Sequence, residues 1–506
     1  MKVHVSCFVD SDPKFVIQAY NWVVSLRSSG STATPFICVP DNVLSEHQWR
    51  SFETLGAQVV AAKRFGEGRA AYCNKISQLF VDEVLDCDYL VLSDADIGFL
   101  APPEQAVNGA QLRAKPVDLP NPPAADIEAW LKAIGMAWFG DAETQFAHGQ
   151  GQKEKTEYEA KGLLGPGQQD KTLRRTLAHN YNGGLYVIRR DAIQQLREAW
   201  SNYSAKLLDA APLGAGWAKH ADQIGFACAV HDLGLKVSEL ESGWNFPTHL
   251  NVEYYHTVTD CPELCGLHYH SRMDNHGLPE EAGVPWLDDS INMLREVIRD
   301  GRRACFDNEI FWNYRYKYFP DLGSGLGSRG AALNVKKELS APAFGEMTGF
   351  SVVDVGCGDL EFVRDLNFGD YLGLDLSEQA IATAKAKRPE WSFRHSRIDT
   401  LDDASFDFAL CLDVLIHQPT RAAAEALVDD LLRVARKGVL LSIHSEQQTN
   451  SNISFNTYAI RNYLRDHPDT RGVIPLGQYR DAEILAVSKE QGVFDSIMEP
   501  IKPELA

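Results

Sequence analysis

The chain has 506 residues, of which 44% are hydrophobic and 23% charged; these ordinary globular values exclude a fibrous, largely disordered or membrane-embedded chain. Its length predicts roughly two to three domains. The formal net charge of -20 argues against nucleic acid as a main partner, because an acidic surface repels phosphate.

The N-terminal segment indicates where the protein works. Its sequence, MKVHVSCFVD, alternates like a strand and lacks the apolar stretch and cleavage site of a signal peptide. No later run reaches the roughly 20 apolar residues that span a bilayer. We therefore expect a cytoplasmic protein without a transmembrane segment, with peripheral attachment at the inner face of the membrane as a further option.

The ten cysteines also favour a reducing compartment, because several lie in apolar runs where cysteine behaves as a small hydrophobic residue. Cys261 and Cys265 form a C-x3-C pair. No second pair supplies the remaining ligands of a zinc site, so a structural metal is disfavoured there.

Short apolar segments alternate with helical patterns in the first hundred residues. Strands are expected at residues 3–9, 35–39, 57–61 and 88–93, and helices at Phe15–Ser28 and Lys75–Leu85. This alternation predicts an α/β fold with a largely parallel sheet covered by helices.

Residues 114–169 interrupt this alternation with a Pro-rich stretch, an amphipathic helix around Ala124–Phe139 and a polar segment. We interpret them as an insertion that could act as a lid. Strands are expected again at Leu185–Arg189 and Leu264–His268, and a helix at Trp286–Asp300 closes the first unit.

Two carboxylates follow the strand at residues 88–93. Asp94 and Asp96 are separated by one residue in VLSDADIGFL, a spacing that lets both converge on a divalent ion. Taken alone, the pair fits a structural turn better than a metal site, because acidic pairs are common in turns. Four other motifs accompany it: YCNK (Tyr72–Lys75), NGGL (Asn182–Leu185), ADQ (Ala221–Gln223) and GLHYH (Gly266–His270).

This ordered set resembles the GT-A glycosyltransferases, most closely the retaining glycogenin-like family that includes bacterial lipooligosaccharide galactosyltransferases, over roughly residues 1–275. The resemblance implies a Rossmann-like fold for a nucleotide sugar, with Mn²⁺ (or Mg²⁺) held by Asp94, Asp96 and His268. Such an ion stabilises the charge of the departing nucleotide diphosphate. His270 is the alternative ligand, because it faces the same side of the strand two residues later. Two structural histidines are the remaining interpretation.

The resemblance also implies that Lys75, Asn182, Gly183 and Arg272 bind the donor, expected to be a UDP-sugar, together with the two metal-site aspartates. Asp222 matches the family's acid beside the reacting sugar and is the catalytic candidate. The alternatives are a plain turn at Asn182, a helix N-terminal acid at Asp222 and solvated charges at Lys75 and Arg272. The Lys-Pro-Trp ending typical of the family is absent, so the donor sugar and the retaining outcome stay open.

A second series of strands and helices opens at Phe350. The segment SVVDVGCG (Ser351–Gly358) runs from a strand into Gly-x-Gly, where the missing Cβ lets the backbone approach a cofactor. The next strand, YLGLDLS, ends in Asp375, an acid suited to ribose hydroxyls. Two further strand signals follow, at Arg397–Asp399 and Phe406–Asp413.

These segments resemble the class I S-adenosylmethionine methyltransferases, over roughly residues 306–506. The resemblance implies a Rossmann-like sheet and cofactor contacts from Asp354, Gly356 and Gly358 (methionine), Asp375 (ribose), Asp399 (adenine) and Asp413. A nicotinamide-dependent dehydrogenase is the alternative, but the chain lacks the third glycine of the dinucleotide fingerprint.

The Gly/Ser-rich run at Asp321–Gly330 favours a flexible linker by composition alone. Together with FWNYRYK (Phe311–Lys317), however, it resembles an arm that folds over the cofactor in some of these methyltransferases. We therefore place the domain boundary near Cys305, with a GT-A domain at 1–305 and a methyltransferase domain at 306–506 whose arm is 306–345.

His417 follows the fourth predicted strand of the second series, where the methyl acceptor is expected. An imidazole with a pKa near 6.5 suits a general base for a sugar hydroxyl. The alternative is a histidine that caps the next helix. Tyr458, Arg461 and Arg480 are further candidates for the acceptor pocket.

The two resemblances together predict a bifunctional enzyme that adds a sugar to a bacterial surface glycan or glycolipid and O-methylates a sugar hydroxyl. Joining the two domains would raise the effective concentration of one product at the next site. The alternatives are two independent transferases with unrelated acceptors, and a glycan-binding scaffold with one inactive domain.

Overall fold

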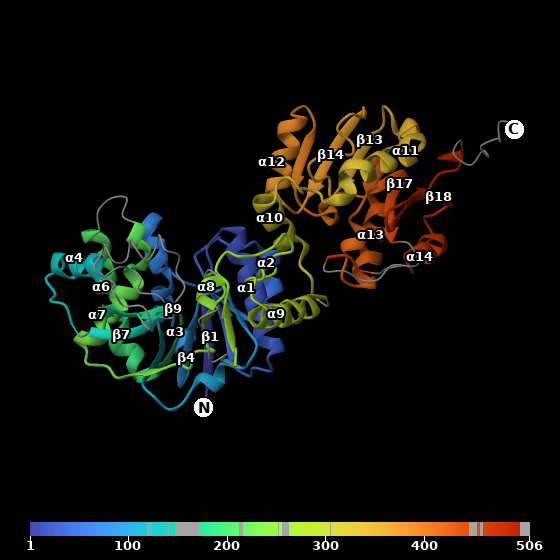
Figure 1. Cartoon of the computed structure of the whole chain (residues 1–506). Coiled ribbons are helices and arrows are strands. Elements are labelled where there is room, and N and C mark those ends of the chain that lie inside the picture. The colour runs from blue at the N-terminus through green and yellow to red at the C-terminus, as the bar shows by residue number, and fades with distance from the viewer. Residues whose placement is uncertain are drawn as a thin grey trace. The chain divides into compact units, whose positions relative to one another are not determined.

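The computed structural model describes residues 1–118, 122, 124–139, 141–146, 172–211, 216–250, 252–255, 263–303, 305–444, 453–455 and 459–495. These residues form two compact units. The first comprises Met1–Asp274 and Leu278–Gly301, and the second Asn275–Gly277 and the chain from Arg302 onward. Figure 1 colours the first unit from blue to yellow-green and the second from yellow to red. Within the described ranges, no helix is long and apolar enough to cross a membrane.

A seven-stranded sheet forms the centre of the first unit. Its strands, in spatial order, are β10 (Val237–Glu239), β6 (Leu112–Pro116), β9 (Tyr181–Arg189), β4 (Tyr89–Ser93), β1 (Val3–Phe8), β2 (Thr34–Val39) and β3 (Gln58–Ala61). β1 to β4 are mutually parallel, whereas β9 is antiparallel to β4 and β6. The α/β class is confirmed, and the sheet is largely parallel as expected: four of its six strand pairings are parallel and only β9 runs against the other strands. β9 is reversed because β6 and β9 form an extended hairpin, a connection that makes neighbouring strands antiparallel.

Helices cover both faces of this sheet, with α1 on one side and α6 and α7 on the other (Figure 1). The helices are α1 (Pro13–Ser28), α2 (Glu46–Thr54), α3 (Asp82–Leu85), α6 (Arg190–Ala210), α7 (Ala221–Asp232), α8 (Val252–Tyr255) and α9 (Pro285–Arg303). Asp12 caps α1 by accepting a hydrogen bond from the Lys14 N–H. The core on the α6–α7 side joins Ile188 of β9 to Trp200 and Phe226 of these helices.

The predicted helix Lys75–Leu85 is different in the structure. A 3-10 helix occupies Gly68–Phe80, and only α3 is α-helical. The Asn74 Oδ1 accepts hydrogen bonds from the backbone N–H groups of Phe65 (2.9 Å) and Gly66 (3.3 Å), which ties this segment to the loop that precedes it.

The insertion begins after β6 ends at Pro116, so residues 114–116 belong to the main sheet. It contains α4 (Ala124–Ala133) and the antiparallel pair β7 (Asp141–Phe146) and β8 (Thr172–Leu177). The predicted helix at Ala124–Phe139 is therefore shorter than expected. Gly135, with φ +78°, follows it in a turn that closes the helix end. The rest of the predicted insertion, residues 147–169, lies outside the described residues.

A small three-stranded sheet brings the GLHYH motif (Gly266–His270) next to the turn that contains Asp94 and Asp96, which we call the acidic turn. Its strands are β11 (Phe246–Pro247), β12 (Gly266–His268) and β5 (Ile97–Phe99). β12 pairs antiparallel with β5, so that His268 lies opposite Ile97. This pairing brings residues about 170 positions apart in the chain to the end of β4.

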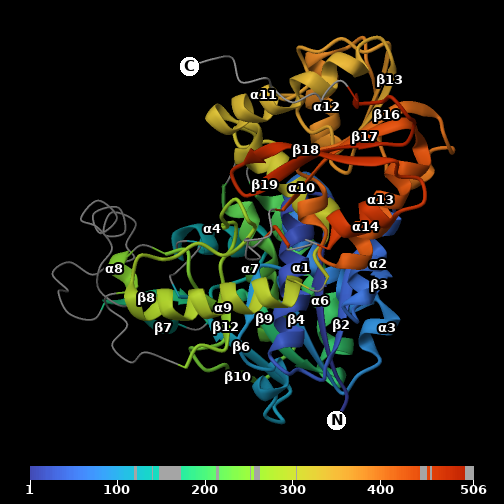
Figure 2. The same cartoon turned by 90° about the vertical axis from the view of Figure 1, so that its right-hand side faces the viewer.

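The second unit contains another seven-stranded sheet. In spatial order its strands are β15 (Ser392–His395), β14 (Asp370–Asp375), β13 (Ser351–Val355), β16 (Phe406–Cys411), β17 (Ala435–His444), β19 (Ala482–Ser488) and β18 (Gly472–Tyr479). The first five are parallel. β19 is antiparallel to β17 and β18, which are red-orange and red in Figure 2.

Helices cover both faces of this sheet, because successive apolar side chains of its strands point to opposite faces. They are α10 (Asn308–Tyr318), α11 (Gly330–Met347), α12 (Glu378–Lys387), α13 (Arg421–Val434) and α14 (Ile460–Asp466). Val353 packs in one core with α13 and α14, and the preceding Val352 packs in another with α11. The parallel strands therefore end at a common edge between two helical layers.

Candidate functional site

The acidic turn of the first unit lies between β4 and β5 and is held by backbone hydrogen bonds from two directions. The Asp94 N–H donates to the Gly184 carbonyl at 2.8 Å, and the Tyr269 N–H donates to the Asp96 carbonyl at 3.1 Å. The turn is therefore fixed to β9 on one side and to the segment after β12 on the other.

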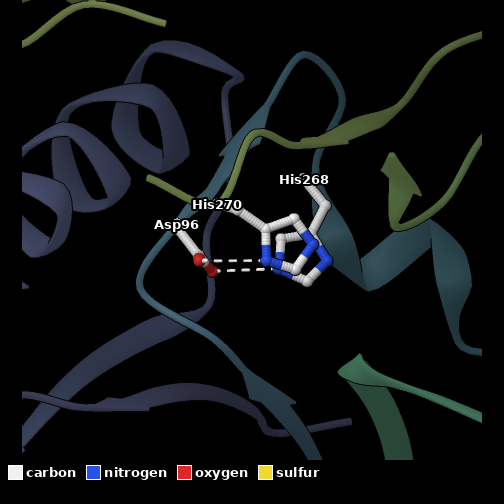
Figure 3. A group of neighbouring side chains, drawn as sticks. All are labelled: Asp96, His268 and His270. Carbon is white, nitrogen blue, oxygen red and sulfur yellow. Dashed lines mark ion pairs between the residues drawn. The ribbon is translucent and has the colours of Figure 1, made fainter. Parts of the chain in front are cut away.

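Asp96, His268 and His270 point toward one another at this turn (Figure 3). His268 Nε2 lies 3.1 Å from Asp96 Oδ1, and His270 Nδ1 lies 3.9 Å from Asp96 Oδ2. The three side chains offer one carboxylate and two imidazole nitrogens to a common point.

Asn245 sets the tautomer of His268. The Asn245 Nδ2 donates to the Asn182 carbonyl at 3.3 Å, so its Oδ1 is the acceptor that faces His268 Nδ1 at 2.8 Å. In the neutral ring Nδ1 therefore carries the proton, and the lone pair of Nε2 faces Asp96 Oδ1. Both of these buried atoms lack a hydrogen-bond partner among the described residues. Two facing acceptors fit a cation between them, and the Asn245 contact is a typical support for a histidine ligand.

Gly184 makes this arrangement possible. A Cβ added to it would lie 2.6 Å from His268 Nδ1, and would also collide with Asn245 Oδ1. Neither Gly184 nor Asn245 was identified as a site residue from the sequence. The NGGL motif contains Gly184, so the sequence did point to this region. Nothing in the sequence near Asn245 indicates its contact with His268, 23 positions away.

His270 reaches the site by a different route from the one predicted. β12 ends at His268, so the two histidines do not share a strand. His270 has a left-handed backbone with φ +50°, and the buried Gln18 amide donates a hydrogen bond to its carbonyl. The turn brings its ring beside that of His268, with 3.9 Å between the ring centroids.

Asp94 faces a different partner. The Lys75 ammonium lies 2.8 Å from its Oδ1 and 3.0 Å from its Oδ2. Lys75 also donates to the Gly183 carbonyl at 2.8 Å and lies 3.4 Å from Asp222 Oδ2. Burial alone would lower the pKa of Lys75, but Asp94 and Asp222 raise it above its usual range. Lys75 therefore joins three other predicted site residues, Asp94, Gly183 and Asp222, into one cluster.

Asn182 and Arg272 both have protein partners. Asn182 lies in β9 rather than in a plain turn, and its side chain donates to Asp118 Oδ2 at 3.1 Å. Arg272 donates to the backbone carbonyls of Thr248 (3.2 Å) and Glu281 (2.9 Å). Asn182 therefore precedes the cluster residue Gly183 in β9 with its side chain toward Asp118, whereas the contacts of Arg272 are with two loops. Cys261, the other half of the C-x3-C pair, lies outside the described residues.

The second unit contains a cavity of about 370 Å³ at the carboxyl edge of its parallel strands. In open α/β sheets this edge, next to the switch in strand order, is the usual place for a ligand. Most of the predicted cofactor residues line it, together with the predicted base: Asp354, Gly356, Asp375, Asp399, Asp413 and His417. Gly358 is adjacent, since its N–H donates to Asp375 Oδ2 at 2.9 Å.

Backbone geometry at the Gly-x-Gly turn requires both glycines. Gly356 and Gly358 have φ values of +73° and +56°, in the left-handed region that other residues rarely adopt. A Cβ on Gly358 would lie 2.7 Å from the Tyr316 hydroxyl. The turn is therefore packed closely beneath residues that precede the sheet in the chain.

The acids around the cavity are oriented by neighbours. Asp375 accepts hydrogen bonds from the N–H groups of Gly358 and Ser377, and burial raises its pKa to about 6. Asp354 accepts a hydrogen bond from the Tyr371 hydroxyl at 2.7 Å, and burial raises its pKa to about 7.

The predicted arm covers this cavity rather than acting as a free linker. Arm residues Asn308, Trp312, Tyr316, Ser324, Ser328 and Lys336 line it. Two contacts attach the arm to the glycine turn, because Ser324 Oγ donates to Asp359 Oδ1 at 2.7 Å and Arg329 pairs with the same carboxylate. The arm is also attached to the end of β16, by the ion pair between Lys336 and Asp413 at 2.8 Å.

His417 ends a short 3-10 helix, Leu415–His417, at the same edge. Its Nδ1 donates to the Ile453 carbonyl at 2.5 Å, which leaves Nε2 as a proton acceptor. Burial lowers its pKa to about 4. The N-cap of α13 is Thr420, so His417 is not the capping residue of that helix.

Of the three other residues predicted for the acceptor pocket, two lie within the described structure. Arg461 pairs with the buried Glu483. Arg480, with φ +51°, lies in the turn that joins β18 to β19. Tyr458 lies outside the described residues.

Comparison with known proteins identifies one segment. Residues 353–443 match the family model described as a methyltransferase domain. No curated protein matches the chain. Solved structures similar to it include magnesium protoporphyrin IX methyltransferase from Synechocystis PCC 6803 with bound SAM, at 20% identity over 37% of this chain and 98% of that one, with a TM-score of 0.29. N-methyltransferase NodS from Bradyrhizobium japonicum WM9 with S-adenosyl-l-homocysteine is 12% identical over 38% of this chain and 96% of that one, with a TM-score of 0.28.

Proposed function

We propose that the chain is a bifunctional enzyme, because residues 353–443 of its second unit match a methyltransferase domain. In this proposal the second unit O-methylates a sugar hydroxyl. The first unit transfers a sugar from a nucleotide-sugar donor, with UDP-sugars as the first choice, to a bacterial surface glycan or glycolipid.

The cavity of the second unit supports the methyltransferase part. S-Adenosylmethionine, when bound, supplies an electrophilic methyl group. Asp375 would accept the ribose hydroxyls, because backbone N–H groups already orient both of its oxygens. Gly356 and Gly358 allow close approach of the methionine part beside Asp354, while Asp399 lies where the adenine is expected. Asp413 would face the same ligand from the opposite side of the switch in strand order.

His417 is the proposed general base. Its Nδ1–H is held by the Ile453 carbonyl, so Nε2 presents the lone pair that takes the proton of the attacking hydroxyl. With a pKa lowered by burial, the ring is neutral at pH 7 and able to accept that proton. His417→Gln should slow methyl transfer by about 10²–10⁴-fold, the usual contribution of a positioned base, and leave S-adenosylhomocysteine binding unchanged. A rate equal to wild type would remove His417 from this role.

The single observation that carries the glycosyltransferase part is the buried pair formed by Asp96 Oδ1 and His268 Nε2, two facing acceptors without other partners. The site fits a divalent ion, which would neutralise the diphosphate leaving group of the donor. Asn182 and Gly183 would contact the donor sugar. Asp222 would lie beside that sugar, since a Cβ on Gly183 would be 3.5 Å from Asp222 Oδ2.

The proposal is tested by measuring Mn²⁺-dependent sugar release from UDP-, GDP-, dTDP- and CMP-sugars, with Asp96→Asn as the matched variant. Transfer of tritiated methyl from S-adenosylmethionine to the same glycan acceptors is measured in parallel. Turnover of one donor that the variant loses supports the first activity and identifies the sugar. A folded protein that binds glycan, methylates it, and releases no sugar from any donor would instead be a methyltransferase with a glycan-binding first unit.

A further inference from the structure

The side chains at the end of β4 separate into two groups. Asp96 faces two imidazoles, whereas Asp94 faces an ammonium group. We propose that Asp96, His268 and His270 are the protein ligands of a divalent transition-metal ion bound in preference to Mg²⁺, and that Asp94 is not a ligand. The inference relies on the proposed function only for the role of the ion in sugar transfer, since metal binding is measured without a donor.

The distances already approach those of a coordinated ion. Metal–ligand bonds of about 2.0–2.2 Å place neighbouring donor atoms roughly 3.0–3.5 Å apart. His268 Nε2 and Asp96 Oδ1 are 3.1 Å apart, and all three ligand atoms lie within 4.8 Å of one another. His270 Nδ1, 3.9 Å from Asp96 Oδ2, has to move inward slightly, and its side chain is 42% exposed and has room to do so.

Burial gives an independent reason to place a ligand there. His268 is 2% exposed, and its Nε2 has no hydrogen-bond partner among the described residues. Asn245 keeps a proton of this ring on Nδ1, so in the neutral imidazole Nε2 is an acceptor that faces Asp96. A buried pair of acceptors at this distance is unfavourable unless a cation or a proton lies between them.

The contacts of Lys75 exclude Asp94 from the ligand set. Lys75 lies within 3.0 Å of both Asp94 oxygens, and the side chains are 13% (Lys75) and 29% (Asp94) exposed. Turning Asp94 toward the ion would leave the ammonium with the Gly183 carbonyl and Asp222 alone, and the loss of a partner destabilises a charge that is largely removed from solvent. Asp94 thus serves to hold Lys75 beside the donor residues.

The ligand set predicts the metal preference. Imidazole nitrogen suits zinc, iron, nickel and copper, whereas sites for Mg²⁺ are built from carboxylate, carbonyl and water oxygens. A site with two imidazoles and one carboxylate should therefore bind Zn²⁺, Co²⁺ or Mn²⁺ more tightly than Mg²⁺. Its remaining coordination positions would be open to diphosphate oxygens.

The test is calorimetric titration of the full chain with MnCl₂, ZnCl₂ and MgCl₂, together with the absorption spectrum of bound Co²⁺. His270→Gly removes the ligand and accepts the left-handed backbone, and should weaken Mn²⁺ and Zn²⁺ binding by at least about tenfold and change the Co²⁺ spectrum. Asp94→Asn should leave both unchanged. His268→Ala should abolish binding, and His47→Ala in α2 is a control outside the site.

Three results overturn the inference: unchanged affinity in His270→Gly, a loss in Asp94→Asn as large as in His268→Ala, or Mg²⁺ affinity equal to that of Mn²⁺ and Zn²⁺. Absence of any metal binding by the wild-type chain overturns both this inference and the metal-dependent mechanism. Metal binding with the expected variant pattern, but without sugar release from any donor, overturns the proposed glycosyltransferase and leaves the metal site standing.

Discussion

Gly184 is the residue of the first unit at which one added carbon has the clearest expected effect. Gly184→Ala would push Asn245 and His268 apart, because the new Cβ lies 2.6 Å from His268 Nδ1. We expect Mn²⁺ affinity to fall by about 10–100-fold, as when the support of a ligand is lost. The measurement is Mn²⁺ titration by calorimetry.

Gly266→Ala in β12 is the matched control for this variant. The nearest atoms to its added Cβ are at 3.6 Å, an ordinary contact, so its Mn²⁺ affinity should equal that of wild type. Equal affinities for both variants would show that the contact between Asn245 and His268 does not support metal binding.

His417 should make the stability of the second unit depend on pH. Its pKa is about 4 in the folded unit and near 6.5 in an unfolded chain. Between these values the unfolded chain binds a proton that the folded unit does not, so stability falls as pH drops from about 6.5 toward 4.

This contribution amounts to about 1.4 kcal/mol per pH unit within that window. His417→Gln should remove it, which is measured as the difference between wild type and variant in urea unfolding from pH 7 to pH 5. The same difference at every pH would mean that His417 titrates normally in the folded unit. Comparing the two proteins is necessary because burial raises the pKa of Asp354 and Asp375, which gives the opposite slope.

At the scale of elements, the arm is attached to the sheet by a buried cation. Lys336 in α11 is 1% exposed and pairs with Asp413, whereas the next residue, Lys337, makes an exposed pair with Asp365. Lys336→Met should cost about 3–5 kcal/mol of unfolding free energy, since a buried carboxylate loses its partner. Lys337→Met should cost less than about 1 kcal/mol.

Chemical unfolding measures both variants, and S-adenosylhomocysteine titration reports on the cavity. We expect Lys336→Met to weaken cofactor binding and Lys337→Met to leave it at the wild-type value. Equal effects of the two substitutions would show that the arm does not depend on the Lys336–Asp413 pair.

The local pattern of the sequence predicted most helices and strands. It did not predict features that depend on contacts between residues far apart in the chain. The strands that became β1 to β4, and the gathering of Asp354, Asp375 and Asp413 at one edge, follow from apolar runs and from parallel order. The direction of β9 depends on a long hairpin connection, which periodicity does not reveal. Asn245 and Lys336 act through partners 23 and 77 positions away, and no local pattern identifies such partners.

At the scale of the whole molecule, the two compact units should respond separately to their ligands. A ligand that binds only the folded state raises stability by about 2.7 kcal/mol at 100 times its Kd. In differential scanning calorimetry, S-adenosylhomocysteine should move one transition upward, and MnCl₂ with UDP should move the other. A single transition that both ligands shift equally would mean that the units unfold together.

Asp413 is synthesised well after its ion-pair partner Lys336, and this order matters for folding on the ribosome. Lys336 emerges first, and its partner follows 77 residues later, after all of β13 to β16. Until then the lysine keeps its hydration, because a buried unpaired ammonium is costly. The nascent arm should therefore stay open while the first unit, which is complete earlier in the chain, already has the means to fold. A translational pause before Asp413 would hold the chain with its first unit complete and the sheet of its second unit uncovered by the arm.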